Sequence, residues 1–199
     1  MHTMKWKLKD ILMMAIAAAI FGVIYLGNVY LGGAITAALT PLGWGTIGYE
    51  PLYGIYFMAA PFVTYIVRKP GIGIIAEIIA AIVEVLLGNW FGPSVIITGI
   101  LQGCACELVF LITRYKKWNM PVMMLSGVSV AVISFARHMI TESYYLLSVN
   151  VWLTMLIIRI ISSVIFAGIL AKLLADALKK AGVLKGYAIS TDAEELYEE

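Results

Sequence analysis

Long apolar stretches separated by short polar connections dominate the sequence. Six stretches can be delimited, at residues 8–30, 51–67, 72–87, 95–113, 122–141 and 151–174. Each is close to the roughly 20 residues that a helix needs to cross the apolar core of a bilayer. Lipid offers the backbone no hydrogen-bond partners, and the strand alternation of a membrane barrel is absent, so helices are expected. The pattern therefore predicts an all-α integral membrane protein with six transmembrane helices.

Connections that contain lysine or arginine alternate with connections that contain neither. This alternation predicts the orientation of the helices. Twelve of the fourteen lysine and arginine residues lie toward the two ends of the chain and after the second and fourth stretches: Lys5, Lys7, Lys9, Arg68, Lys69, Arg114, Lys116, Lys117, Lys172, Lys179, Lys180 and Lys185. The connections at residues 31–50, 88–94 and 142–150 contain no lysine or arginine. Because basic loops remain in the cytoplasm, both the N- and C-termini are expected to be cytoplasmic.

Composition supports one membrane domain. The 199 residues are 62% hydrophobic and only 13% charged, whereas soluble domains are about half apolar and a quarter charged. This excludes a soluble enzyme and a disordered chain, and a net charge of +2 is too balanced for a nucleic-acid-binding protein. The first stretch is too long for a signal peptide and lacks a cleavage site, so it is expected to be retained. We expect a six-helix membrane domain over residues 1–185 and an acidic, flexible cytoplasmic tail over residues 186–199.

Charged and titratable side chains inside the stretches are the first functional signal, because a charge at membrane depth is costly and marks a functional site by default. At a rise of 1.5 Å per residue, Glu84 lies about 7 Å and Arg159 about 12 Å below the outer ends of their helices. Arg137 and His138 also fall in this outer half. Two further glutamates, Glu77 and Glu107, fall in the inner half and are expected to serve packing or partner contacts.

Polar and aromatic residues gather at the same outer depth and predict a ligand site there. A carboxylate can offset the charge of a cationic aromatic ligand while ring faces stack on it, which adds roughly 0.5–2 kcal/mol per cation–π contact. We expect Glu84 to be the countercharge. The further candidates are Trp90, Trp44 and Tyr53 for stacking, His138, Glu142 and Asn150 for hydrogen bonds, and Glu50, Asn89 and Tyr145 at the same depth.

Each of these features also has a plain structural explanation. The aromatic residues could form an interfacial belt, and the charges could form internal ion pairs. His138 and Glu142 are four residues apart and could pair with each other as readily as they orient a ligand. The glycine-rich connection at residues 31–50 could be a lid or a passive loop. These alternatives remain open at this point.

Several catalytic motifs are missing from the sequence. There is no phosphate-binding loop for ATP hydrolysis, no nucleophile elbow and no His-Glu-x-x-His zinc motif. Two histidines and two cysteines form no ligand cluster by spacing, so neither a metal site nor a covalent cofactor is expected. Cys104 and Cys106 are interpreted as buried, reduced packing residues. The protein is not expected to be an enzyme.

Three segments resemble a known family. The stretch from Glu50 to Gly71 (EPLYGIYFMAAPFVTYIVRKPG) is the most specific, and Glu77 with EVLLGNW at 84–90, and the Gln102-Gly pair with ELVF at 107–110, support it. The chain resembles the YkoE family over about residues 5–185. Proteins of this family are substrate-binding S components of energy-coupling factor (ECF) transporters.

The resemblance implies a membrane protein that captures thiamine, or its hydroxymethylpyrimidine precursor, from outside the cell membrane of a prokaryote. It implies partners as well, namely a transmembrane coupling subunit and cytoplasmic ATPase subunits. The Ala-x-x-x-Ala docking motif of the superfamily corresponds to Ala15 and Ala19 in the first helix. Members have also been described as cobalt-transport components.

Other functions remain open from the sequence alone. The chain could be a standalone proton-coupled secondary transporter of a small organic cation, with Glu84 or Glu107 as the proton relay. It could be an S component for another vitamin or for cobalt, and an intramembrane enzyme is a third class. The sequence does not separate thiamine from hydroxymethylpyrimidine or a phosphate ester.

Overall fold

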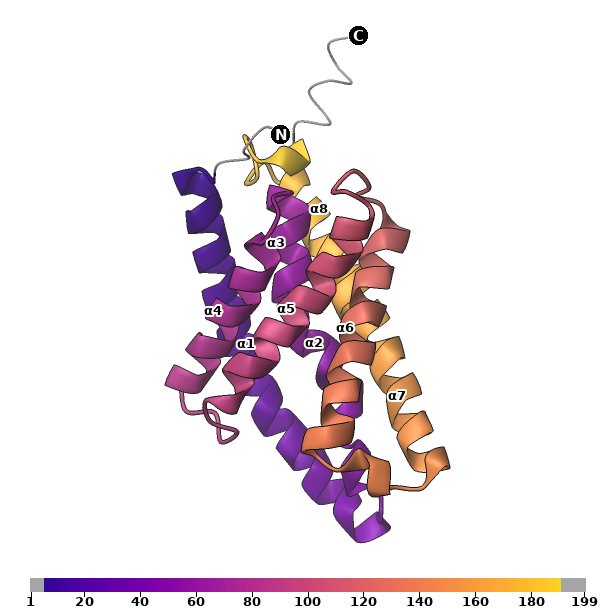
Figure 1. The fold of residues 1–199 in the computed structure, drawn as a ribbon. Helices are drawn as coiled ribbons and strands as arrows, with labels where there is room; N and C mark the ends of the chain where they lie inside the picture. The colour runs from indigo at the N-terminus through magenta and orange to yellow at the C-terminus, as the bar shows by residue number, and fades with distance from the viewer. Residues whose placement is uncertain (1–5, 191–199) are drawn as a thin grey trace.

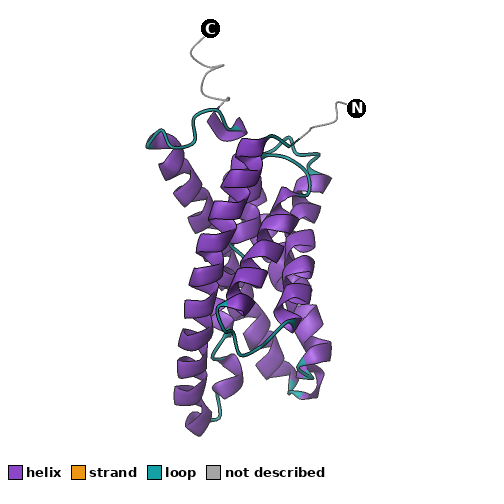
Figure 2. Cartoon of the chain, turned by 90° about the vertical axis from the view of Figure 1, so that its left-hand side faces the viewer, coloured by secondary structure: helices purple, strands orange, loops and turns teal. Residues whose placement is uncertain are grey.

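The computed structural model describes residues 6–190, which form a bundle of helices along one long axis (Figures 1 and 2). The described residues contain no β-strand. The helices are α1 Leu8–Leu39, α2 Tyr53–Tyr56, α3 Ala59–Val67, α4 Ile72–Leu86, α5 Ser94–Ile112, α6 Met120–Thr141, α7 Val149–Ser163 and α8 Ala171–Lys180. Short 3-10 turns lie at Thr40–Leu42, Gly45–Ile47, Glu50–Leu52 and Tyr144–Leu146, and a π-helix, Val164–Leu170, joins α7 to α8.

Within residues 6–190, four helical segments are long and apolar enough to cross a membrane. They are Leu8–Leu42, Ser94–Ile112, Met120–Thr141 and Val149–Lys180. The prediction of an all-α membrane protein is therefore confirmed in its class. The second and third predicted spans correspond to shorter helices, since α3 has 9 residues and α4 has 15.

The second predicted span is not one continuous helix. The chain leaves helical geometry between α2 and α3, so the expectation of an unbroken helix over residues 51–67 was wrong. The break is stable because two freed backbone N–H groups find acceptors: Ala59 N donates to the Tyr25 hydroxyl at 3.0 Å and Ala60 N to the Glu77 carboxylate at 2.9 Å. In an apolar surrounding such groups need internal partners.

The first helix is longer than the apolar pattern indicated. It runs to Leu39, so the connection predicted at residues 31–50 begins only after that point. Gly32 and Gly33, in the C-terminal third of this helix, serve close packing rather than loop freedom. A Cβ atom on Gly32 would lie 2.2 Å from the Tyr49 ring, and one on Gly33 would lie 2.8 Å from the Trp90 ring.

Helix α6 begins at a local signal and packs closely on the π-helix. The Asn119 side chain accepts a hydrogen bond from Val122 N at 3.2 Å, and Pro121 follows in the first turn, as is common at helix N-termini. A Cβ atom on Gly127 would lie 2.7 Å from Ser163 O, and one on Gly168 would lie 2.8 Å from Met124 Cα. Glycine at these positions lets the two backbones approach.

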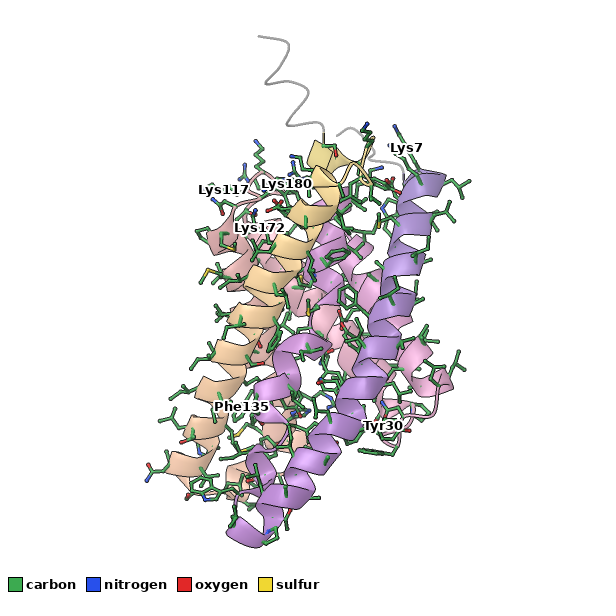
Figure 3. The ribbon with its side chains drawn as sticks, turned by 180° about the vertical axis from the view of Figure 1, so that it is seen from behind. Lys7, Tyr30, Lys117, Phe135, Lys172 and Lys180 are labelled. Atoms are coloured by element: carbon green, nitrogen blue, oxygen red, sulfur yellow. The ribbon has the colours of Figure 1, made fainter. Side chains whose placement is uncertain are left out.

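Both ends of the described chain lie at one end of the bundle (Figure 1). Figure 3 shows Lys7, Lys117, Lys172 and Lys180 at this same end, while Tyr30 and Phe135 lie toward the other. The lysine pattern of the sequence thus corresponds to one end of the molecule.

Some expectations concern the ends of the chain and the cysteines. Lys5 and the acidic residues of the tail from Asp192 on lie outside the described residues. Within residues 186–190, Ile189 is fully buried and the Tyr187 hydroxyl donates to Lys9 O at 3.0 Å, so this part packs on the bundle.

Both cysteines are free, but only Cys106 is buried. The expectation that Cys104 is buried was wrong, because it lies on an exposed face of α5.

Candidate functional site

A cavity of about 330 Å³ lies between α1, α2, α4, α5 and α6, and the connections after α1, α4 and α6 contribute to its lining. Its size is at the lower end of the range for sites of small organic ligands, about 300–1,000 Å³. Six aromatic residues line it: Tyr25, Tyr49, Tyr53, Tyr56, Phe91 and Tyr144. The charged and polar residues of the lining include Glu77, Glu84, Thr98, Gln102, Arg137, His138 and Glu142.

Glu84 lies on the cavity wall and is hydrogen-bonded by a neutral side chain. It is 2% exposed, and its Oε1 atom accepts a hydrogen bond from Asn89 Nδ2 at 2.6 Å. Asn89 is held in turn by Phe91 N, which donates to Asn89 Oδ1 at 2.6 Å. None of the ion pairs formed within residues 6–190 involves Glu84. A buried carboxylate without a cation is unfavourable, so binding of a ligand that brings positive charge would stabilise it.

Glu77 lies two turns before Glu84 on the same face of α4 and also lines the cavity. It accepts from the Tyr25 hydroxyl at 3.0 Å and from Ala60 N at 2.9 Å, at the N-terminus of α3. A carboxylate is favoured there by the unpaired N–H groups and the helix dipole. The expectation that Glu77 serves packing or partner contact is therefore too narrow, because the residue also lines the cavity.

Glu107 plays a similar part away from the cavity. Its carboxylate accepts from Gly73 N at 2.9 Å, in the first turn of α4, and from the Tyr115 hydroxyl. It is 5% exposed and is not part of the cavity lining. This agrees with the predicted packing role.

A buried ion pair stands behind another wall of the cavity. Arg159 binds Glu50 with two hydrogen bonds, from Nε at 2.7 Å and from Nη2 at 2.6 Å, and both residues are fully buried. The Arg159 guanidinium also lies 3.7 Å from the centre of the Tyr53 ring. Glu50 is not in the cavity lining, and its role in substrate binding stays a prediction. Its carboxylate is occupied by the arginine that the sequence placed at a similar depth.

His138 contacts this pair rather than Glu142, which directly follows α6. Its Nδ1 atom lies 3.0 Å from Arg159 Nη1, and no bond joins its ring to the Glu142 side chain. The pairing of His138 with Glu142 considered from the sequence is therefore not formed. Both residues line the cavity, His138 as a buried side chain and Glu142 as an exposed one.

The structure brings together part of the predicted site. Glu84, Tyr53, His138 and Glu142 line the cavity, and Asn89 contacts it through Glu84. The remaining predicted residues lie outside the lining: Glu50, Trp44, Trp90, Tyr145 and Asn150. The rings of Trp44, Trp90 and Tyr145 are 52%, 53% and 61% exposed, which fits an interfacial belt. Trp90 packs edge-on against Tyr30 at 5.0 Å between ring centres.

Several lining residues were not among the sequence candidates, notably Tyr25, Tyr56 and Gln102. A signal for them exists, since a hydroxyl or amide inside an apolar helix needs a polar partner and therefore faces other helices or a cavity. The prediction of site residues was based on their depth in the membrane and did not use this signal.

The predicted docking residues lie on the surface of α1. Ala19 is exposed and Ala15 half-buried, beside the exposed side chains of Ile16 and Ile20. Two small side chains thus lie beside larger apolar ones on the outside of the bundle. The docking role itself stays a prediction.

Possible metal ligands are scattered rather than clustered within residues 6–190. No group of three or more His, Cys, Asp or Glu side chains in this part of the chain is arranged to hold a metal ion. The donors that surround the cavity are instead aromatic rings, hydroxyls and separate carboxylates.

Comparison with known proteins gives consistent matches. Residues 9–133 match the family model described as "ABC-type cobalt transport system, permease component". The chain is 42% identical over 187 residues to the "Putative HMP/thiamine permease protein YkoE" of Bacillus subtilis (strain 168), covering 94% of this chain and 92% of that protein. A solved structure described as "Crystal structure of an S-component of ECF transporter" superposes with a TM-score of 0.91 at 40% identity, covering 98% of this chain and 96% of the other.

The long apolar helices are those of a multi-pass membrane protein, and the fold is that of an ECF transporter S component. The chain belongs to the family of YkoE-type S components, which the family model describes as transport permeases. The resemblance found in the sequence is confirmed. Both relatives are transport proteins, which agrees with a non-enzymatic role in transport.

Proposed function

We propose that this S component captures thiamine, or its hydroxymethylpyrimidine precursor, from outside the cell for ATP-driven uptake by partner subunits. The observation that carries the proposal is the Glu84 carboxylate, buried on the wall of an aromatic cavity and hydrogen-bonded by a neutral amide. Thiamine brings a fixed positive charge on an aromatic ring, which such a wall would neutralise and stack against. The name of the Bacillus subtilis relative supports the same ligand class.

The cobalt named in the family description fits the cavity less well than an organic ligand does. Cobalt prefers clustered imidazole, thiolate or carboxylate donors. The described residues hold no such cluster, and the lining instead offers six aromatic rings. We therefore propose an aromatic organic ligand of the thiamine or hydroxymethylpyrimidine class rather than cobalt.

The proposed topology has six spans with both termini in the cytoplasm. The spans would be α1, the broken segment from Glu50 to Val67, α4, α5, α6, and the continuous helix Val149–Lys180. The basic end of the bundle would face the cytoplasm of a prokaryotic cell, by the positive-inside rule. The cavity, whose lining includes the connections at the other end, would then open to the outside.

The proposed partners are an ECF transmembrane coupling subunit and cytoplasmic ATPase subunits. The sequence has no phosphate-binding loop, so it has no ATP-hydrolysing motif of that kind. The surface of α1 around Ala15 and Ala19 is the proposed contact for the coupling subunit, because small residues let another helix approach closely.

A binding and transport experiment on the purified chain tests this function. Titration in detergent with thiamine, hydroxymethylpyrimidine and thiamine monophosphate, followed by tryptophan fluorescence and calorimetry, should give saturable 1:1 binding of at least one of them. In vesicles holding this chain alone, the account expects binding without accumulation. Accumulation driven by a proton gradient would instead establish a standalone carrier, and failure of all three compounds to bind would refute the ligand class.

A further inference from the structure

The contact between Arg159 and His138 determines which kind of ligand atom the cavity can accept at one position. Arg159 Nη1 lies 3.0 Å from His138 Nδ1. A guanidinium carries only donors, so the imidazole nitrogen that faces it must be the acceptor. His138 Nδ1 is therefore unprotonated, and the ring is neutral with its proton on Nε2.

Arg159 is unable to turn away from this contact. Its Nε and Nη2 atoms are bound to the two oxygens of Glu50 at 2.7 and 2.6 Å. Nη1 also donates to Ser134 Oγ at 3.3 Å. The Tyr53 and Phe135 rings lie 3.7 and 4.9 Å from the guanidinium carbon. The fork geometry of a bidentate pair adds direction as well as energy.

The His138 ring is held from its sides as well. Its centre lies 5.4 Å from that of Tyr53 and 5.8 Å from that of Tyr144, and all three rings line the cavity. His138 is 7% exposed. Because Nδ1 faces Arg159, the Nε2–H group is the ring donor left for a ligand.

From these contacts we infer that Arg159 and Glu50 are positioning residues that hold His138 as a fixed hydrogen-bond donor to the ligand. The ligand class that this selects carries an acceptor, such as a pyridine-type ring nitrogen or a carbonyl oxygen, where it meets His138. A ligand that presents an N–H group at that point leaves two donors facing each other. This inference deepens the proposed function and rests on it for the identity of the ligand, whereas the tautomer of His138 does not depend on that identity.

The first test reads the tautomer directly and needs no ligand. The sequence contains two histidines, His2 and His138. A His2→Ala variant with a histidine-free purification tag therefore carries a single imidazole, whose two nitrogens can be observed by ¹⁵N NMR after histidine labelling. The expected result is a pyrrole-type signal for Nε2 and a pyridine-type signal for Nδ1. A protonated Nδ1, alone or with a protonated Nε2, would overturn the inference and leave the proposed function untouched.

A variant of the pair supplies the control. In Glu50→Leu/Arg159→Met both charges are removed together, which avoids leaving one buried charge alone. The Nδ1 signal should then lose the signature of a donor bond from the guanidinium. An unchanged Nδ1 signal would show that Arg159 does not fix the ring.

The second test measures whether the ligand accepts a hydrogen bond from His138 Nε2–H. Thiamine is compared with two analogues in which one or the other pyrimidine nitrogen is replaced by C–H. For one analogue, affinity should fall about 5- to 100-fold in the unmodified protein, since a lost acceptor leaves a buried donor unpaired. This ratio should shrink to less than about 3-fold in His138→Leu and be partly restored in His138→Gln, whose amide N–H can replace the donor. Equal affinity for all three compounds, with thiamine still bound, would overturn the donor role while the proposed function survives.

Discussion

Glu84 and Asn89 form a pair in which the acid has a neutral partner: Asn89 Nδ2 lies 2.6 Å from Glu84 Oε1 and contributes a hydrogen bond but no positive charge. The other outer-half glutamate, Glu50, is bound on both oxygens by Arg159. Two acids at similar depth thus have opposite states. One is satisfied within the protein, and the other is available to a cationic ligand in the cavity.

The buried pair should be more sensitive to loss of one partner than to loss of both. Arg159→Met alone leaves the Glu50 carboxylate buried without its cation, and we expect a loss of about 3–5 kcal/mol in unfolding free energy. Glu50→Leu/Arg159→Met replaces both by apolar side chains and should cost clearly less. Denaturant unfolding in detergent measures both variants. A double variant as unstable as the single one would contradict this description of the pair.

The break between α2 and α3 should depend on the Tyr25 hydroxyl. Tyr25→Phe removes the acceptor of Ala59 N and the donor to Glu77 while keeping the ring, so a loss of about 1–3 kcal/mol is expected. Tyr30→Phe is the matched control, because Tyr30 lies on the same helix and its side chain is 51% exposed. Equal stability of the two variants, measured by thermal unfolding, would show that the hydroxyl does not support the break.

Two glycines should respond oppositely to the same substitution. A Cβ atom on Gly54 would lie 2.2 Å from the backbone oxygen of Ser162, so Gly54→Ala must push α2 away from α7 and should destabilise the fold by roughly 1–3 kcal/mol. Gly27 lies within α1 with nothing within 4 Å of its Cβ position. Gly27→Ala should be neutral or stabilising by up to about 1 kcal/mol, as expected in a helix interior. A melting temperature unchanged in Gly54→Ala would contradict the close approach.

The helical class and the end-to-end charge pattern were predictable because they depend on hydropathy and on lysine position along the chain. The break after α2 was not, since it depends on Tyr25 and Glu77 from two other helices. The outer end of α1 was missed for a similar reason, because Gly32 and Gly33 look like loop residues until Tyr49 and Trp90 pack on them.

The sequence predicted the depth of the candidate-site residues along their helices, but not which of them face the cavity. Depth placed Glu84, Tyr53 and His138 in one layer, and they do line one cavity. The same depth included Trp44 and Trp90, whose rings lie exposed on the surface. Which side of a helix faces the cavity depends on how the helices pack, and a single sequence does not specify that for residues near helix ends.

The most direct test of the central claim is the affinity of purified Glu84→Gln for thiamine, with uncharged hydroxymethylpyrimidine as the matched ligand. If Glu84 neutralises a cationic ring, thiamine affinity should fall about 10- to 150-fold, the equivalent of about 1.5–3 kcal/mol, while affinity for hydroxymethylpyrimidine changes by less than about 3-fold. Thiamine affinity equal to that of the unmodified protein would contradict the claim that this carboxylate is the countercharge for the ligand.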